Sequence, residues 1–315
     1  MKTKSNLEEV LEAGKFAITA ELGPPHNADP EVVRRKASIL KGYVDAFNVT
    51  DGQSAVVAMA SWAACLIGKQ EGLDPIVQMT CRDRNRIALQ MDILGAAALG
   101  INNILCLSGD PISFGNQPQA KPVMDLDSIQ FVGIVKDIRD GKKLQNGEPI
   151  LGRGPQLFIG AVANPFDELP EPEVARLAKK VEAGADFIQT RAVYNVEDFE
   201  RWMEMVWERE LHNRVKILAG ITPLKSLGAA RFMKANIPGV DIPNELFERL
   251  RKATTKEQVR KEGIKIALET INRVKEIKGV AGVHIMAMEW EEAIPEICEA
   301  SGLYPRSSHA LSHNC

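Results

Sequence analysis

The sequence has no strong excess of charge and few aromatic side chains. Its 315 residues include 39 basic and 42 acidic ones, giving a formal net charge of −3, and aromatic residues make up only 5% of the chain. A nucleic-acid-binding domain usually carries a clear surplus of Lys and Arg. The composition therefore predicts no nucleic-acid partner, and a hydrophobic share of 45% is typical of a globular protein.

Clustered cysteines and long apolar runs are also missing. The five cysteines are odd in number and far apart, which argues against a disulfide framework or a complete zinc site. The N-terminal stretch is charged, unlike a secretory signal, and no run approaches the roughly 20 apolar residues that a membrane-spanning helix needs. We therefore expect a reduced, cytoplasmic protein with no membrane span and no metal site. We interpret His309, His313 and Cys315 as part of a disordered tail, 306–315.

The sequence does contain a regular alternation of short apolar runs and amphipathic stretches. Each run is apolar nearly throughout, as expected of parallel strands that are buried on both faces. The predicted strands span 16–21, 46–51, 75–81, 103–110, 157–164, 187–193, 216–221 and 283–288.

The stretches between these runs carry apolar residues three and four positions apart, which predicts helices in the gaps between the strands. Eight βα units with right-handed crossovers make a (β/α)8 TIM barrel of the α/β class the simplest fold. No linker of biased composition is present, so we expect one domain over 1–315. Residues 111–156 exceed a minimal connection, and we predict that they form one helix plus an extra hairpin or lid.

Polar residues stand where several strands are expected to end. In such a barrel, catalytic residues come from the C-terminal ends of the strands. Glu21 ends the first strand shortly before Gly-Pro-Pro, and Asp110 ends the fourth strand in Ser-Gly-Asp-Pro. Two carboxylates and several amides at one rim favour a binding site with Glu21 as a general acid. Simpler roles stay open for each: Glu21 could pair with Arg82, Ser-Gly-Asp-Pro could be only a turn, and Asp83 could cap a helix.

Eight short motifs occur along the chain in a characteristic order. They read AELGPP, NVTDGQSAV, VQMTCRDRNR, LCLSGDP, KPVMDLDS, AKKVEAGADFIQTRAVY, AGITP and GVHIMAM. By this ordered set the chain resembles the methylenetetrahydrofolate reductase family, and most of all its short bacterial and archaeal form. The resemblance runs from about residue 15 to about residue 305. No single motif is decisive, whereas the set in this order is highly specific.

The resemblance implies a flavin-binding (β/α)8 barrel that reduces 5,10-methylenetetrahydrofolate to 5-methyltetrahydrofolate. In the family, reduced flavin passes a hydride to the methylene carbon of the folate. Glu21 matches the catalytic glutamate, which protonates the folate ring nitrogen as the five-membered ring opens. Asp110 matches an aspartate close to the flavin and folate rings. The implied cofactor is FAD, with FMN as the alternative.

Other site residues are carried over from the same motifs. The residues implied to bind the cofactor are Thr50, Gln78, Ser108, Gly109, Asp110, Leu126, Asp127, Asn164, Lys179 and Lys180. The residues implied to bind the substrate are Glu21, Asp110, Gln189, Arg191 and Met286. The two lysines match a basic pair that reaches the cofactor phosphates, for which a lysine is a suitable point charge.

The chain departs from the family pattern at three places. It reads SGD where many relatives read RGD, which removes a basic residue near the cofactor, and IQTR where they read ITQ, so either Gln189 or Arg191 could contact the pterin. Met286 stands where a tyrosine is common, and other aromatics that relatives use to sandwich nicotinamide or pterin are missing. Two electron sources are therefore open: NAD(P)H, or a partner subunit with iron–sulfur clusters, as in acetogen relatives. We expect an oligomer.

Two other functions stay open at this stage. A flavin-free lyase or aldolase-type barrel would bind a phosphorylated substrate at the same rim, although no lysine is evident at a strand end. An electron-relay or scaffold subunit would bind flavin and leave the substrate to another chain. The presence of Glu21 beside a complete polar rim favours the reductase.

Overall fold

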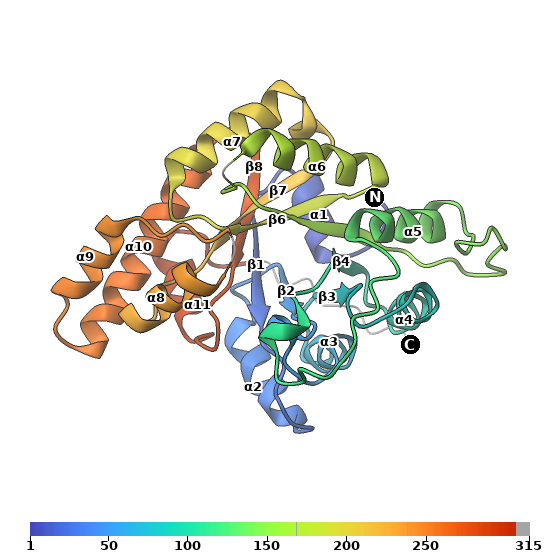
Figure 1. The fold of residues 1–315 in the computed structure, drawn as a ribbon, viewed down its shortest axis with the longest axis horizontal. Coiled ribbons are helices and arrows are strands. Elements are labelled where there is room, and N and C mark those ends of the chain that lie inside the picture. The colour runs from blue at the N-terminus through green and yellow to red at the C-terminus, as the bar shows by residue number, and fades with distance from the viewer. Residues whose placement is uncertain (168, 238, 307–315) are drawn as a thin grey trace.

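The computed structural model describes residues 1–167, 169–237 and 239–306. Within them, eight parallel strands close into a barrel in chain order, and the last strand pairs with the first (Figure 1). The predicted (β/α)8 TIM barrel is thereby confirmed. The strands are β1 (Ala17–Leu22), β2 (Ala46–Val49), β3 (Pro75–Thr80), β4 (Asn103–Leu107), β5 (Phe158–Ala163), β6 (Phe187–Ala192), β7 (Lys216–Ile221) and β8 (Val280–Ile285).

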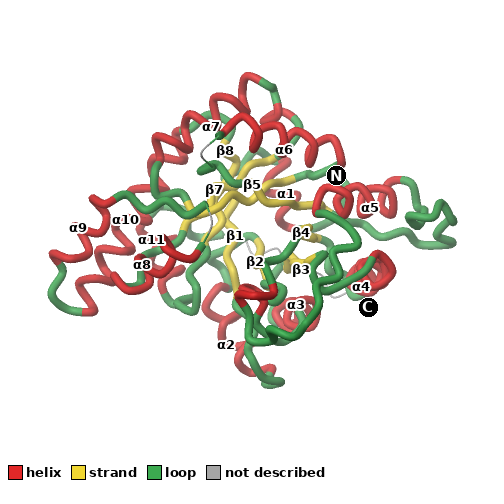
Figure 2. Tube along the Cα trace, viewed as in Figure 1, coloured by secondary structure: helices red, strands yellow, loops and turns green. Residues whose placement is uncertain are grey.

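Helices follow the strands and surround them, as the red segments outside the yellow strands show (Figure 2). α4 begins after Asn85, whose side chain accepts hydrogen bonds from two backbone N–H groups of the first turn. The cap of this helix is therefore Asn85 and not Asp83. The helices are α1 (Asn6–Glu12), α2 (Pro30–Leu40), α3 (Ser61–Gln70), α4 (Arg86–Ala98), α5 (Ser128–Asp140), α6 (Pro170–Ala183), α7 (Val196–Glu208), α8 (Leu227–Asn236), α9 (Asn244–Lys252), α10 (Lys256–Glu276) and α11 (Ala293–Ala300).

The alternation of side chains along the strands divides the apolar core into two layers. Residues such as Ile18 and Ala20 belong to the layer between the strands and the outer helices. Their neighbour Ala17 belongs to a second cluster inside the barrel, together with Leu7 and Leu11 of α1. α1 therefore closes the barrel at the amino ends of the strands, which leaves the carboxyl ends as the open rim.

The segment 111–156 contains the predicted helix, α5, and the predicted hairpin. An antiparallel bridge joins Lys143 to Pro149 in this hairpin. The backbone N–H of Gln145 donates to Oε1 of Gln90 in α4 at 2.9 Å, and the segment extends outward from the barrel in Figure 1. The hairpin thus lies against α4 on the outside of the barrel, so the alternative of a lid is wrong for it.

Several predicted boundaries differ from the structure. β2 ends at Val49 and β4 at Leu107, so Asp51 and Asp110 lie in the loops that follow these strands. β8 spans Val280–Ile285 instead of 283–288, and Met286 lies after its end. Positive φ angles end the extended backbone: 95° at Gly109 in the loop after β4, and 41° at Met288 in the loop after β8.

Two helices, α1 and α11, were not among the predicted ones. The predicted disordered tail is described only at Arg306, and its remaining residues, 307–315, lie outside the described part of the chain. None of the helices in the described ranges combines the length and the apolar content that a membrane crossing requires.

Candidate functional site at the carboxyl ends of the strands

A cavity of about 390 Å³ opens at the carboxyl ends of the strands. Residues from β1, β3, β4, β5, β6 and β8 and from the loops after the strands line it. Eleven of the residues that the sequence nominated are brought together here: Glu21, Thr50, Gln78, Ser108, Gly109, Asp110, Asn164, Lys180, Gln189, Arg191 and Met286.

Glu21 occupies the junction between this cavity and two others. A second cavity of about 690 Å³ shares Glu21, Thr50 and Gln53 with the first, and a smaller one of about 110 Å³ shares lining residues with both. Glu21 lines all three, although its side chain is only 13% exposed. A group bound in either of the two larger cavities would therefore lie next to the same carboxyl group.

The loop after Glu21 is held in place by a buried lysine. Nζ of Lys36 donates to the carbonyl oxygen of Gly23 at 3.0 Å and pairs with Glu291 at 2.7 Å. The side chains of Lys36 and Glu291 are 17% and 5% exposed, so this pair is largely shielded from water. The end of β1 is thereby fixed from outside the barrel, because α2 supplies Lys36 and the loop before α11 supplies Glu291.

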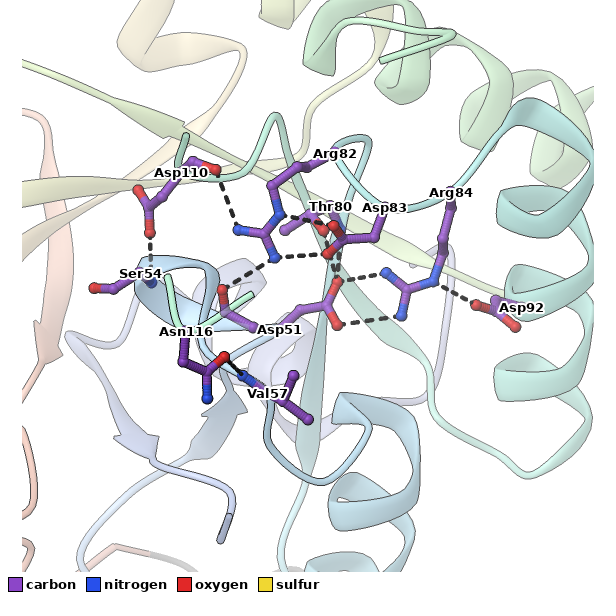
Figure 3. A network of polar contacts seen from close by, with 11 residues as sticks. Asp51, Ser54, Val57, Thr80, Arg82, Asp83, Arg84, Asp92, Asp110 and Asn116 are labelled. Atoms are coloured by element: carbon purple, nitrogen blue, oxygen red, sulfur yellow. Dashed lines mark hydrogen bonds and ion pairs between the residues drawn. The ribbon is translucent and has the colours of Figure 1, made fainter. Parts of the chain in front are cut away.

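A network of acids and arginines fixes the loops on the neighbouring strands (Figure 3). Oδ2 of Asp51 accepts hydrogen bonds from the backbone N–H and the hydroxyl of Thr80 at 2.8 and 3.0 Å. Arg84 binds both carboxylate oxygens of Asp51, at 2.6 and 3.2 Å, and its Nε pairs with Asp92. A two-pronged contact of this kind restricts the orientation of both partners, so the loop after β2 is tied to β3 and α4.

Arg82 connects the loops after β2 and β4. The guanidinium binds Asp83 at 2.8 and 2.6 Å and donates to the carbonyl oxygens of Gly52 and Asp110 at 3.1 and 3.2 Å (Figure 3). The alternative in which Arg82 pairs with Glu21 is therefore wrong. The carboxylate of Asp110 accepts the backbone N–H of Ser54 at 2.8 Å, so Asp110 faces the loop after β2.

The backbone at Gly109 approaches its neighbours closely. Its φ of +95° is favourable mainly for glycine, and a Cβ there would lie 2.8 Å from Cβ of Arg82. Glycine at this position therefore has two functions: it permits the turn after β4, and it leaves the backbone open where it lines the cavity.

Two basic side chains of α6, Arg176 and Lys180, line the cavity together with two acids, Glu173 and Asp167. Arg176 pairs with Glu173 at 3.5 Å. Nζ of Lys180 donates to the carbonyl oxygen of Val162 at 2.6 Å. Burial lowers the pKa of Lys180 and the nearby Arg176 lowers it further, whereas Glu173 opposes the shift. A bound anion would favour the charged form of Lys180, because an opposite charge at close range stabilises an ammonium group.

Three residues nominated for the cofactor do not line the cavity. Lys179 is exposed on α6, Leu126 is buried in the apolar core, and Asp127 caps α5 in a reciprocal contact with Gln130. The start of α5 reaches the cavity through Ser128 instead.

A buried polar layer lies directly below Glu21, and most of it was missed from the sequence. It consists of Thr19, Asn48, Gln189 and His284, each no more than 3% exposed. Only Gln189 had been nominated. Side chains two residues apart on a strand point to the same face. Thr19 lies two residues before Glu21 and His284 two residues before Met286, so this spacing could have identified them as neighbours of the site.

A closed parallel barrel with a polar cavity at the carboxyl ends of its strands defines a (β/α)8-barrel protein whose site lies where enzymes of this fold carry out catalysis. Among the described residues no group of three or more His, Cys, Asp or Glu side chains is placed to hold a metal ion. A sequence model of the methylenetetrahydrofolate reductase family matches residues 6–302. The chain belongs to this family.

Individual relatives agree with this assignment. The chain is 24% identical to methylenetetrahydrofolate reductase 2 of Schizosaccharomyces pombe over 95% of its own length, and it spans about half (47%) of that longer protein. It is also 24% identical to the 5,10-methylenetetrahydrofolate reductase of Buchnera aphidicola subsp. Schizaphis graminum, covering 95% of this chain and 96% of that protein.

A solved structure shares the fold. It is that of an uncharacterized Clostridium thermocellum protein that binds two copies of 5-methyl-5,6,7,8-tetrahydrofolic acid. The TM-score is 0.64 at 15% sequence identity, and the match covers 95% of this chain and all of the other.

Proposed function

We propose that the chain catalyses the flavin-dependent reduction of 5,10-methylenetetrahydrofolate to 5-methyltetrahydrofolate, with Glu21 as the general acid. Family membership over residues 6–302 supports the reaction class. The single observation that supports the site is the position of Glu21 at the junction of two cavities. A two-substrate reaction needs such a junction, because the two reacting groups must meet beside the acid.

The described residues fit a flavin nucleotide in the cavity of about 390 Å³. Lys180 and Arg176 would hold the phosphate end, and the open backbone at Gly109 would lie beside the ring system. Glu21 would deliver a proton to the folate ring nitrogen as the five-membered ring opens to the iminium, which leaves Glu21 as a carboxylate. A bound reduced flavin would supply the hydride that the methylene carbon of the iminium accepts.

The adjacent cavity of about 690 Å³ would receive the folate. Glu21 and Thr50 line it on one side, and exposed apolar residues of two other segments, Phe114 and Phe232, line it as well. A pterin ring with a benzoyl tail needs both polar partners and apolar contact, which this lining offers. That the Clostridium thermocellum protein of the same fold binds 5-methyltetrahydrofolic acid is consistent with this proposal.

FAD is the proposed cofactor, and NAD(P)H or an iron–sulfur partner subunit is the proposed electron source. The purified chain should be yellow, and acid-released flavin should elute as FAD in chromatography. Reduction by NADH followed by reoxidation with methylenetetrahydrofolate, both under anaerobic conditions, tests the complete reaction. Reoxidation by the folate without reduction by NADH would assign the electron supply to a partner subunit. A reduced flavin that the folate does not reoxidise would overturn the proposed function.

A further inference from the structure

The polar layer below Glu21 forms a connected set of hydrogen bonds. Nδ2 of Asn48 donates to Oε1 of Gln189 at 2.8 Å, and Nε2 of Gln189 donates back to Oδ1 of Asn48 at 3.0 Å. Nε2 of Gln189 also donates to the hydroxyl oxygen of Thr19 at 3.1 Å. One N–H of the Gln189 amide therefore goes to Asn48, and the other is directed towards the Thr19 oxygen and Nδ1 of His284.

This arrangement determines which nitrogen of His284 carries the proton. The Thr19 oxygen lies 2.9 Å from Nδ1 of His284, closer than the 3.5 Å to the carbonyl oxygen of Val283. Nε2 of Gln189 lies 3.3 Å from Nδ1 of His284, and an amide nitrogen can only donate, so Nδ1 acts as an acceptor and the Thr19 hydroxyl donates to it as well. The hydrogen bond at one ring nitrogen sets the tautomer, so the neutral ring has its N–H at Nε2.

Nε2 of His284 faces Glu21. It lies 3.8 Å from Oε1 of Glu21, and the side chains are 3% and 13% exposed. This distance is longer than a hydrogen bond, but contacts in catalytic sites commonly shorten when substrate binds. In surroundings this poorly hydrated, an N–H directed at a carboxylate interacts with it more strongly than in water.

We propose that His284 is a positioning residue for Glu21, held by Thr19 so that its Nε2–H orients the carboxyl group and stabilises the carboxylate left after proton transfer. The inference rests on the proposed function, because it assigns to His284 a role in the step that Glu21 carries out. A buried histidine with only a packing role would need a partner at Nδ1 and no particular group at Nε2.

Two substitutions of His284 separate these roles. In His284→Gln the side-chain amide nitrogen takes approximately the place of Nε2, whereas in His284→Asn the shorter amide reaches only the place of Nδ1. The rate at which methylenetetrahydrofolate reoxidises the reduced protein should fall about 10-fold or more in His284→Asn, with KM changed less than about 2-fold. His284→Gln should recover much of the loss.

Two substitutions of Thr19 provide a second test that does not change His284 itself. Thr19→Val keeps the shape of the side chain and removes the hydroxyl that lies 2.9 Å from Nδ1 of His284, whereas Thr19→Ser keeps the hydroxyl. Thr19→Val should slow reoxidation by the folate, and Thr19→Ser should not. Flavin content and the rate of reduction by dithionite should be unchanged in the two Thr19 variants, because Thr19 does not line the cavity proposed for the flavin. His284 does line it, so the rates of the His284 variants are compared per bound flavin.

The outcomes are distinct. If the folate does not reoxidise the unaltered protein, the proposed function fails, and this inference fails with it. If the unaltered protein is reoxidised and His284→Asn and Thr19→Val are as fast, only the role of His284 is overturned. Equal losses in His284→Gln and His284→Asn, with Thr19→Val unaffected, would also overturn it and assign His284 to packing. If His284→Asn does not fold, the Thr19 pair decides.

Discussion

At the scale of single residues, Glu21 is held from two directions. Lys36 binds the loop that follows it, and His284 faces its carboxyl group from inside the barrel. A general acid works only if its proton is within reach of the reacting atom, so such constraints matter more than exposure. The position of Glu21 at the end of β1, beside three cavities, meets this condition.

Replacement of this acid tests its role directly. Glu21→Gln keeps the size and polarity of the side chain but cannot donate a proton from a carboxyl group. We expect the variant to keep its visible flavin spectrum and to lose folate reduction by a factor of roughly 10²–10⁴. Stopped-flow reoxidation of the reduced variant by methylenetetrahydrofolate measures this. Turnover at the normal rate would remove Glu21 from the mechanism.

Gly109 permits a second test at a single position. In Gly109→Ala the new methyl group would lie 2.8 Å from Cβ of Arg82, at a φ of +95°. We expect a loss of about 1–3 kcal/mol in the free energy of unfolding, together with weaker retention of flavin. Urea denaturation and the ratio of flavin to protein absorbance measure the two effects.

Gly147 offers a matched control for this change. Its φ is +88°, but a Cβ there would have no atom within 4 Å. Gly147→Ala therefore introduces a similar backbone strain without the contact and away from the cavity. If both variants lose the same stability and the same flavin, the close approach at Gly109 has no special importance.

At the scale of elements, Asp127 at the N-terminus of α5 can have a structural role as a helix cap or a role in binding the cofactor, and substitutions distinguish the two. Asp127 accepts the backbone N–H of Gln130, and Gln130 reaches back to the backbone of Asp127. Asp127→Ala should lower the free energy of unfolding by about 1 kcal/mol, while Asp127→Asn, which keeps a capping oxygen, should have little effect. Urea denaturation of both variants measures this. If Asp127→Asn loses flavin at unchanged stability, the cofactor role implied by the sequence is supported.

The existence of the strands could be predicted from the sequence, whereas several of their ends could not. The runs before Val49 and Leu107 are apolar, but the extended backbone stops where φ becomes positive a few residues later. Such local angles depend on contacts such as those of Arg82 with the carbonyl oxygens of Gly52 and Asp110. These partners are far apart in the chain, so no local pattern reveals them.

Part of the candidate site could likewise be predicted from the sequence, and part could not. The residues at the rim could be found because they interrupt apolar runs at strand ends. The layer below them could not be found in that way, since Thr19 and His284 lie within strands, where a polar residue most often has a local structural role. The position of Lys180 at the cavity and of Lys179 outside it depends on the rotation of α6 relative to the barrel.

At the scale of the whole molecule, the closed end of the barrel makes stability depend on pH. Oδ2 of Asp74, just before β3, accepts the backbone N–H of Leu7 in α1 at 3.0 Å. Burial raises the pKa of Asp74 to about 6, against an opposing effect of hydrogen bonds from Leu7 and Asn103. The folded state therefore holds a proton that the unfolded state has already released between about pH 4 and pH 6.

The sign of this dependence follows directly. Where the folded state binds more protons, stability falls as pH rises, so the contribution of Asp74 is greatest below about pH 4 and is lost as pH passes 6. Asp74→Asn keeps an oxygen for Leu7 and cannot ionise. Relative to the unaltered protein, it should gain stability between pH 4.5 and pH 7.5 by up to about 3 kcal/mol. Urea denaturation at both pH values measures the difference, and a constant difference would contradict the assignment.

The contact between Thr19 and His284 joins residues that are 265 positions apart in the chain. Pairing over such a distance has a large entropic cost and occurs late in folding. A chain growing on the ribosome therefore contains Glu21 long before its neighbour on β8 has been synthesised. The surroundings of Glu21 are completed when the barrel closes, so catalytic competence would report that the last strand has joined the first.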